Sequence, residues 1–228
     1  MGKDAKVATK SGITKDLRIG DKIIGGEVFA YLFIGDIEGL SCEKNYLSDF
    51  PKERADEILS SKSEKVRRQK TAVWKLLLFA AKEIFGLSAN EIRFEKTEKG
   101  KWLCDKFWFS LSHTDGAAVI VIAEKPCGTD IEYAPKFFEK AAYKSFISSF
   151  LRQIGENDGW DAEKALKLWT KKESVYKLSG DGVFSPKKID VKNENVLTEV
   201  IGDYVLSVAT TDKVNKENLK IIVLLAQF

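Results

Sequence analysis

The sequence lacks the features that mark secreted, membrane-spanning and disulfide-stapled proteins. Its 3 cysteines, Cys42, Cys104 and Cys127, are widely spaced and form no CxxC pair. This spacing favours reduced thiols over a zinc site or a disulfide framework. The first 26 residues carry charges throughout, and the chain has no run of roughly 20 apolar residues that could span a bilayer. We therefore expect a soluble cytoplasmic protein that does not act at a membrane.

Proline and net charge are also scarce. The 4 prolines and the absence of a low-complexity tract argue against long disordered linkers. The formal net charge is only +3, whereas proteins that bind nucleic acid usually carry a stronger basic excess or a basic stripe. We therefore expect no nucleic-acid partner, although a mild basic surplus suits a polyanionic small ligand or an acidic protein.

The hydrophobic patterns predict an α+β protein of two similar-sized units. We expect a loose arm over residues 1–26, a first unit over 27–125 and a second unit over 126–228. The apolar run 117–123 is continuous, which is typical of a strand buried on both faces. The other predicted strands are 28–34, 92–95, 107–111, 129–133, 196–200, 204–209 and 219–225. Helices are predicted after Pro51 and over about 63–85, 136–151 and 162–178, with a loop over 153–161.

A carboxylate lies on the apolar face of the last predicted helix. At about 100° per residue, Glu173 falls within the arc of apolar side chains, Lys172 also lies inside it, and Lys177 follows one turn later. An ionised carboxylate that faces a core must be paired, protonated or bound to a metal. An i, i+4 pair between Glu173 and Lys177 is one interpretation and metal binding is the other. The helix alone leaves both open.

Two further carboxylates lie on the predicted strand 129–133. Asp130 and Glu132 alternate along it, so both side chains point to the same face. Neighbouring carboxylates repel each other unless a cation lies between them. A small set of oxygen ligands suits Mg²⁺ that is completed by waters and phosphates. Together with Glu173, this pair indicates a magnesium site.

His113 is the only histidine, and it follows the predicted strand 107–111 where a polar loop is expected to open. A lone loop histidine is usually solvated or capping. Its place at the end of a buried strand, beside serine and threonine, makes a contact with phosphate or substrate the other interpretation, and the residue chemistry alone leaves both open.

Three blocks of the sequence, in this order and spacing, resemble the signature blocks of phosphopantetheinyl transferases. They are FSLSH at 109–113, GTDIE at 128–132 and WTKKESVYK at 169–177, and a weaker match extends back to Pro51. The length and two-part layout resemble the monomeric surfactin-synthetase-activating type. The resemblance implies two α/β subdomains in a pseudo-twofold arrangement, with the active site between them.

The resemblance also implies a reaction. The 4′-phosphopantetheine arm of coenzyme A would pass to a serine of an apo acyl or peptidyl carrier protein, with release of adenosine 3′,5′-bisphosphate. Asp130, Glu132 and Glu173 match the Mg²⁺ ligands, and Glu173 would also help to remove the serine proton. Lys177 matches the lysine that steadies the pyrophosphate.

Other positions match coenzyme A contacts of the family. His113 and Ser112 match the contact to the 3′-phosphate region, and Gly100 with Lys101 matches the turn beside the adenine. Further matches to coenzyme A contacts are less direct, and they are Arg68 (or Arg67), Lys52 and Lys172. Arginines and lysines on helices are usually solvated, and this is the alternative interpretation of Arg68, Arg67 and Lys52. Lys171 and Lys172 are also candidates for docking an acidic carrier.

The chain departs from the family pattern at Ser110, Trp102 and Thr129, none of which is a metal ligand. Two other functions stay open, a non-catalytic coenzyme A-binding protein on the same scaffold and a Mg²⁺-dependent phosphoester hydrolase. The sequence identifies neither the carrier protein nor the pathway, and it does not separate Mg²⁺ from Mn²⁺.

Overall fold

The computed structural model describes residues 26–37, 39–139, 141–155, 161–180, 183–191 and 195–225, and the backbone of three short strands before them. These strands, β1 (Ala5–Ala8), β2 (Thr14–Ile19) and β3 (Lys22–Ile23), form a small antiparallel sheet. The rest of the arm predicted over 1–26 lies outside the described residues, apart from Gly26. The division of the chain at residues 26 and 126 stays a prediction.

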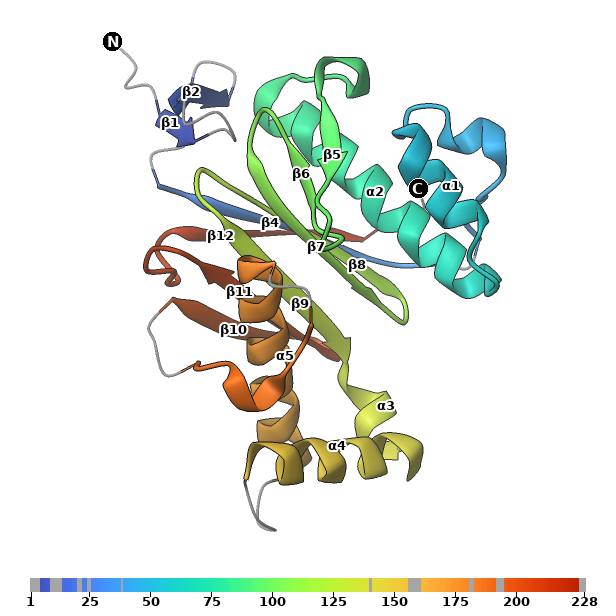
Figure 1. Ribbon diagram of the computed structural model, residues 1–228, viewed down its shortest axis with the longest axis vertical. Coiled ribbons are helices and arrows are strands. Elements are labelled where there is room, and N and C mark those ends of the chain that lie inside the picture. The colour runs from blue at the N-terminus through green and yellow to red at the C-terminus, as the bar shows by residue number, and fades with distance from the viewer. Residues whose placement is uncertain are drawn as a thin grey trace.

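The first large sheet has the order β12-β4-β8-β7 (Figure 1). Its strands are β4 (Val28–Ile34), β7 (Trp108–Thr114), β8 (Ala117–Ala123) and β12 (Leu219–Leu225). Neighbours pair antiparallel except β12, which returns from the end of the chain to pair parallel with β4. Every residue of β8 is buried, which confirms the strand expected to be buried on both faces.

Two helices lie beside this sheet, α1 (Lys52–Leu59) and the long α2 (Glu64–Phe85). The side chain of Ser63 caps the start of α2, and Gly86, with φ of 67°, ends it in the left-handed conformation that glycine adopts most readily. The fully buried Trp74 ring lies about 5.2 Å from the Trp102 ring and 6.3 Å from the Phe109 ring. A large aromatic core thus joins α2 to the sheet.

A short hairpin covers part of this core. It is formed by β5 (Phe94–Lys96) and β6 (Trp102–Cys104), joined through the turn at Gly100, whose φ is 88°. The sequence predicted one strand here, at 92–95, and missed β6 because that strand is only three residues long. Short 3₁₀ turns lie at Lys44–Leu47 and Ala89–Glu91.

The second large sheet has the order β10-β11-β9 and is fully antiparallel. Its strands are β9 (Cys127–Tyr133), β10 (Val196–Ile201) and β11 (Tyr204–Thr210). The helices of this half are α3 (Ala134–Glu139), α4 (Ala141–Ile154) and α5 (Ala162–Ser179), followed by a 3₁₀ turn at Pro186–Lys188. The helix predicted over 136–151 corresponds to α3 and α4, and residue 140 between them lies outside the described part. The predicted loop 153–161 is still helical at Ile154, and residues 156–160 lie outside the described part.

The two sheets pack against each other through an apolar layer that includes Val119, Val121, Ile131 and Leu206. α2 covers the other face of the first sheet and α5 the other face of the second (Figure 1). This mixture of helices and largely antiparallel sheets confirms the predicted α+β class. None of the described helices has the length and apolar character needed to cross a membrane.

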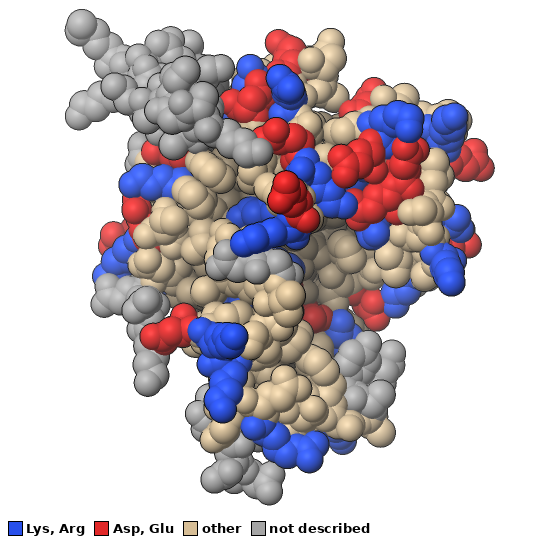
Figure 2. All heavy atoms as spheres, in the orientation of Figure 1, with Lys and Arg blue, Asp and Glu red and all other residues tan. Residues whose placement is uncertain are grey.

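Charged residues of both signs are interspersed over the face shown in Figure 2, in keeping with the small net charge of +3.

Candidate active site

The close approach of α5 to β9 positions the candidate site. A Cβ atom built on Gly128 would lie 1.9 Å from the carbonyl oxygen of Ser174 and 2.4 Å from the backbone nitrogen of Leu178. No other residue type fits at this position without moving α5 or β9. Gly128 therefore allows the helix backbone to rest on the strand, which brings Glu173 and Lys177 to the carboxylates of β9.

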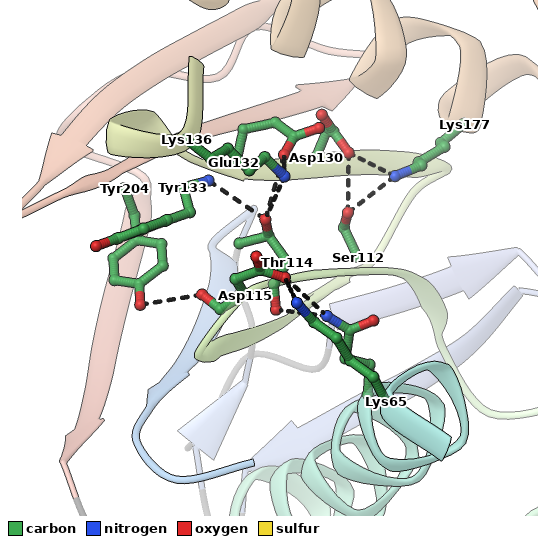
Figure 3. Close-up of polar contacts among 11 residues, drawn as sticks. Lys65, Ser112, Thr114, Asp115, Asp130, Glu132, Tyr133, Lys136, Lys177 and Tyr204 are labelled. Atoms are coloured by element: carbon green, nitrogen blue, oxygen red, sulfur yellow. Dashed lines mark hydrogen bonds and ion pairs between the residues drawn. The ribbon is translucent and has the colours of Figure 1, made fainter. Parts of the chain in front are cut away.

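Asp130 is almost fully buried, at 5% exposure. Its Oδ1 atom accepts hydrogen bonds from Ser112 Oγ at 2.8 Å and from Lys177 Nζ at 2.7 Å (Figure 3). Its Oδ2 atom is buried and has no hydrogen-bond partner among the described residues. A buried oxygen without a partner costs free energy. This atom is therefore a natural ligand for a bound cation.

Glu132 lies two residues further along the same strand. Its Oε2 atom accepts hydrogen bonds from Lys136 Nζ at 2.6 Å and from Thr114 Oγ1 at 3.2 Å (Figure 3). Burial, and next the charge of Asp130, raise the pKa of Glu132 above its ordinary value, and Lys136 only partly opposes them. The two carboxylates of β9 thus repel each other as the sequence predicted.

Glu173 projects from α5 toward this pair. Burial and the charges of Asp130 and Glu132 raise its pKa to about 7. The sequence left open an i, i+4 ion pair between Lys177 and Glu173. Among the described residues Lys177 pairs with Asp130 instead. Burial lowers the pKa of Lys177, but the charges of Asp130 and Glu173 outweigh burial and raise that pKa overall.

The donor set fits a divalent cation. The charge of Asp130 raises the pKa of Glu132, the charges of both raise the pKa of Glu173, and a buried oxygen of Asp130 lacks a partner among the described residues. Oxygen ligands of this kind are those that Mg²⁺ prefers. Within the described ranges, no three His, Cys, Asp or Glu side chains already have the close arrangement of an assembled metal site. Magnesium binding therefore stays a prediction.

Comparisons with known proteins match the half of the chain that carries these residues. Residues 126–215 match the family model described as the 4′-phosphopantetheinyl transferase superfamily. This matched stretch, the superfamily segment, is less than half of the 228-residue chain. A segment of 108 residues is also 31% identical to the 4′-phosphopantetheinyl transferase gsp of Aneurinibacillus migulanus. The alignment covers 46% of this chain and 45% of that relative, so it spans about half of each protein.

These findings confirm the recognition made from the sequence blocks. The superfamily segment contains Asp130, Glu132, Glu173 and Lys177. It does not contain Ser112, which binds Asp130 from β7. The candidate site is thus completed by a strand outside the matched superfamily segment.

His113 lies on β7 and not in a loop, so that part of the sequence interpretation is wrong. It pairs in register with Ala118 of β8, and the hairpin turns at Asp115 and Gly116, whose φ is 68°. An Asp-Gly pair between two strands is a strong hairpin signal that could have corrected the interpretation. Burial, followed by the charges of Lys177 and Arg54, lowers the pKa of His113 to about 4.

Gly100 and Lys101 line a cleft that residues of the superfamily segment also line. Its empty volume is about 640 Å³ including its open mouth, and Trp102, Tyr176 and Lys177 also line it. The Nζ atom of Lys101 donates to the carbonyl oxygens of Lys177 and Leu178 at 2.7 and 2.9 Å. Lys101 therefore caps the C-terminal end of α5 and ties the β5–β6 turn to the site.

Three other predicted coenzyme A contacts, Arg68, Lys52 and Lys172, bind other groups of the protein. Arg68 pairs with Glu64 on α2 at 2.6 Å and lines a separate hollow. Lys52 has a 90% exposed side chain and pairs with Asp56.

Lys172 is buried, and its Nζ atom donates to the carbonyl oxygens of Pro186 and Ile189 at 2.9 and 2.6 Å. It therefore anchors the segment after α5. The coenzyme A roles of Arg68, Lys52 and Lys172 stay predictions.

Sequence reasoning missed Thr114 and Lys136, although both contact Glu132. The serine, serine and threonine at alternate positions 110, 112 and 114 were the available signal for Thr114. Their side chains all face β9. Ser110 accepts a hydrogen bond from the backbone nitrogen of Thr129, whereas Ser112 and Thr114 donate to the carboxylates of Asp130 and Glu132 respectively.

Proposed function

We propose that this chain transfers 4′-phosphopantetheine from coenzyme A to a serine of an apo acyl or peptidyl carrier protein, with Mg²⁺ as the metal. The observation that carries this proposal is the electrostatic interaction of Asp130, Glu132 and Glu173, from β9 and α5, with one another and with Lys177. The match of residues 126–215 to the superfamily supports the same activity. The name of the relative, a 4′-phosphopantetheinyl transferase, supports it independently.

Asp130, Glu132 and Glu173 would hold the metal, with Asp130 supplying its otherwise unpartnered Oδ2 atom. A bound Mg²⁺ offsets negative charge on phosphate oxygens, which is the chemistry this group supplies. Lys177 adds a second positive charge, fixed by Ser112 and Asp130 at 3.0 and 2.7 Å. Its role is to bind the diphosphate of coenzyme A and to stabilise the departing bisphosphate.

Glu173 accepts the proton of the carrier serine in this proposal. The serine oxygen forms a bond to the β-phosphorus of coenzyme A, and the bond from that phosphorus to the bridging oxygen breaks. The bridging oxygen leaves with adenosine 3′,5′-bisphosphate. A base works best when its pKa is close to the operating pH, and the pKa of Glu173 is raised to about 7.

We also propose that the chain consists of two related subdomains in a pseudo-twofold arrangement. In chain order, β4, α2, β7 and β8 correspond to β9, α5, β10 and β11. The sheet orders β4-β8-β7 and β9-β11-β10 then match strand for strand, and both are antiparallel. A long helix covers each of them.

The partners of the proposed reaction are coenzyme A and the carrier protein, without nucleic acid or membrane. We propose a monomer in the cytoplasm, because one chain supplies every residue of the proposed site and Cys42, Cys104 and Cys127 are all free thiols.

The test combines the purified protein with coenzyme A, Mg²⁺ and several apo carrier proteins, and weighs each carrier by intact mass spectrometry. A gain of one phosphopantetheine that is abolished by EDTA is the expected result. Coenzyme A cleavage without carrier modification would instead assign a phosphoester hydrolase. Coenzyme A binding without transfer to any carrier would assign the non-catalytic alternative.

A further inference from the structure

Lys136 is a buried lysine at the candidate site that no sequence motif marked. It lies on α3, one turn after Glu132, and its side chain is only 11% exposed. Its Nζ atom donates to Glu132 Oε2 at 2.6 Å and to Thr114 Oγ1 at 3.0 Å (Figure 3). The ring of Phe137 lies 5.0 Å from the same nitrogen. Several contacts therefore fix the ammonium group beside the carboxylate.

The contacts of Lys136 repeat those of Lys177. Around Asp130, a hydroxyl of β7 (Ser112) and the lysine Nζ both bind one carboxylate oxygen, and the lysine also donates to that hydroxyl at 3.0 Å. The second triad has the same form, with Thr114 of β7 and Lys136 binding one oxygen of Glu132. Each carboxylate of β9 thus has one hydroxyl from β7 and one lysine from a helix (Figure 3).

A cation on Glu132 and the ammonium of Lys136 compete for the same carboxylate. Two positive charges at one carboxylate repel strongly in a site that is largely closed to water. The side chain of Glu132 is 19% exposed, so solvent screens this repulsion little. Metal binding at Glu132 therefore weakens the contact of Lys136 with Oε2, even where the cation takes the other oxygen, and it favours the transfer of this positive charge to an anion.

We propose that Lys136 is a second diphosphate-binding lysine of the site. It neutralises Glu132 before the metal binds, and it moves from Glu132 to the coenzyme A diphosphate when the cation takes that carboxylate. This inference rests on the proposed function for its second step only, because the competition with metal requires no substrate.

The test measures two equilibria for Lys136→Met and the wild-type protein. Without nucleotide, Mn²⁺ binding followed by electron paramagnetic resonance should be about fivefold or more tighter in the variant, because its competitor is gone. With saturating Mg²⁺, coenzyme A binding measured by calorimetry should be about tenfold weaker, because a charged contact to the diphosphate is lost. Lys136→Arg should restore coenzyme A affinity, since it keeps the charge.

The matched control is Lys167→Met, which also removes a lysine from an i, i+4 ion pair, here the exposed pair with Glu163. It should change neither equilibrium. Thermal unfolding checks that each variant is folded, and Lys136→Gln replaces Lys136→Met if the latter does not fold.

Unchanged or weaker Mn²⁺ binding in the variant would show that Lys136 does not compete with metal, and would overturn the proposal. Tighter Mn²⁺ binding with unchanged coenzyme A affinity would overturn the diphosphate step. If the wild-type protein binds no coenzyme A at all, the proposed function fails, while the Mn²⁺ titration still decides the first step.

Discussion

α2 and α5 are both long helices on antiparallel sheets, but α2 meets its sheet through large apolar side chains and α5 through small polar ones. On α2, Trp74, Leu76 and Leu77 are completely buried, and the Trp74 ring packs edge-on against Phe109 of β7. This interface is a dry, aromatic core of the kind that contributes most to stability.

At the α5 interface the contacts are short and polar. Thr170 and Ser174 are completely buried, Thr170 Oγ1 lies 2.9 Å from Ser207 Oγ, and Gly128 lets the backbones touch. Small residues bring α5 close enough to place Glu173 and Lys177 beside Asp130. The comparison teaches that one helix stabilises the molecule while the other positions its chemistry.

The largest expected effect is on the rate of transfer, through a residue of α5. Glu173→Gln should lower the rate of transfer by about 100-fold or more, because it removes both a proton acceptor and a metal ligand. The unfolding temperature should stay close to that of the wild-type protein, or rise, because the variant removes a carboxylate from a repulsive cluster. Intact-mass kinetics and calorimetry measure the two quantities.

The control for this variant is Glu163→Gln on the exposed side of the same helix. Transfer by Glu173→Gln at the wild-type rate would remove Glu173 from the proposed mechanism.

The next largest effect tests the contribution of α2 to the free energy of unfolding. Trp74→Ala should lower the free energy of unfolding by about 3–5 kcal/mol, because it opens a cavity in the aromatic core. Mn²⁺ affinity should be unchanged wherever the variant is folded, since Trp74 does not contact the carboxylates. Denaturant unfolding and a metal titration check this, with the partly exposed Phe79→Ala of the same helix as control.

A loss of Mn²⁺ affinity in folded Trp74→Ala would show that the two helices are not as separate in role as the packing indicates.

Gly128→Ala should lower both the free energy of unfolding and Mn²⁺ affinity. Its new Cβ atom overlaps the carbonyl of Ser174, so the free energy of unfolding should fall by about 1–3 kcal/mol. Mn²⁺ affinity should fall as well, because α5 must shift away from β9. Gly202→Ala is the control, since its φ of 56° strains an alanine while nothing lies within 4 Å of the new atom.

The two glycine variants separate the effect of backbone strain from the effect of displacing α5 from β9. Equal Mn²⁺ affinity in Gly128→Ala and Gly202→Ala would show that close helix packing does not set the metal site.

The smallest effect concerns pH. Because the pKa of His113 is lowered to about 4, the protein's single histidine should show no titration by NMR between about pH 5 and pH 8. The unfolded chain takes up this proton first, so His113 by itself lowers stability as pH falls from about 6.5 toward 4, whereas the raised pKa of Glu173 raises stability as pH falls over much of this range. A midpoint near 6.5 for the folded protein would contradict the burial of this side chain.

The sequence predicted what local periodicity controls. Strands β4, β8 and β12 were predicted with the correct bounds, and the helix predicted over about 63–85 ends at Phe85 as α2 does. The shared face of Asp130 and Glu132 follows from strand alternation alone.

What the sequence did not predict depends on contacts between distant elements. The pairing of Lys177 with Asp130 instead of Glu173 requires the close packing of α5 on β9. The burial of the ammonium of Lys172 against two backbone carbonyls requires the path of the chain after α5. The contact of Lys136 with Thr114 likewise depends on how β7 lies beside β9.

The central claim is that Glu173 and its neighbouring carboxylates transfer phosphopantetheine to a carrier serine. The most direct measurement follows adenosine 3′,5′-bisphosphate and the carrier mass in one reaction, for the wild-type protein and for Glu173→Gln. The account predicts one bisphosphate released for each carrier modified by the wild-type protein, and almost none of either product with the variant. Release of bisphosphate without a matching gain in carrier mass would contradict it.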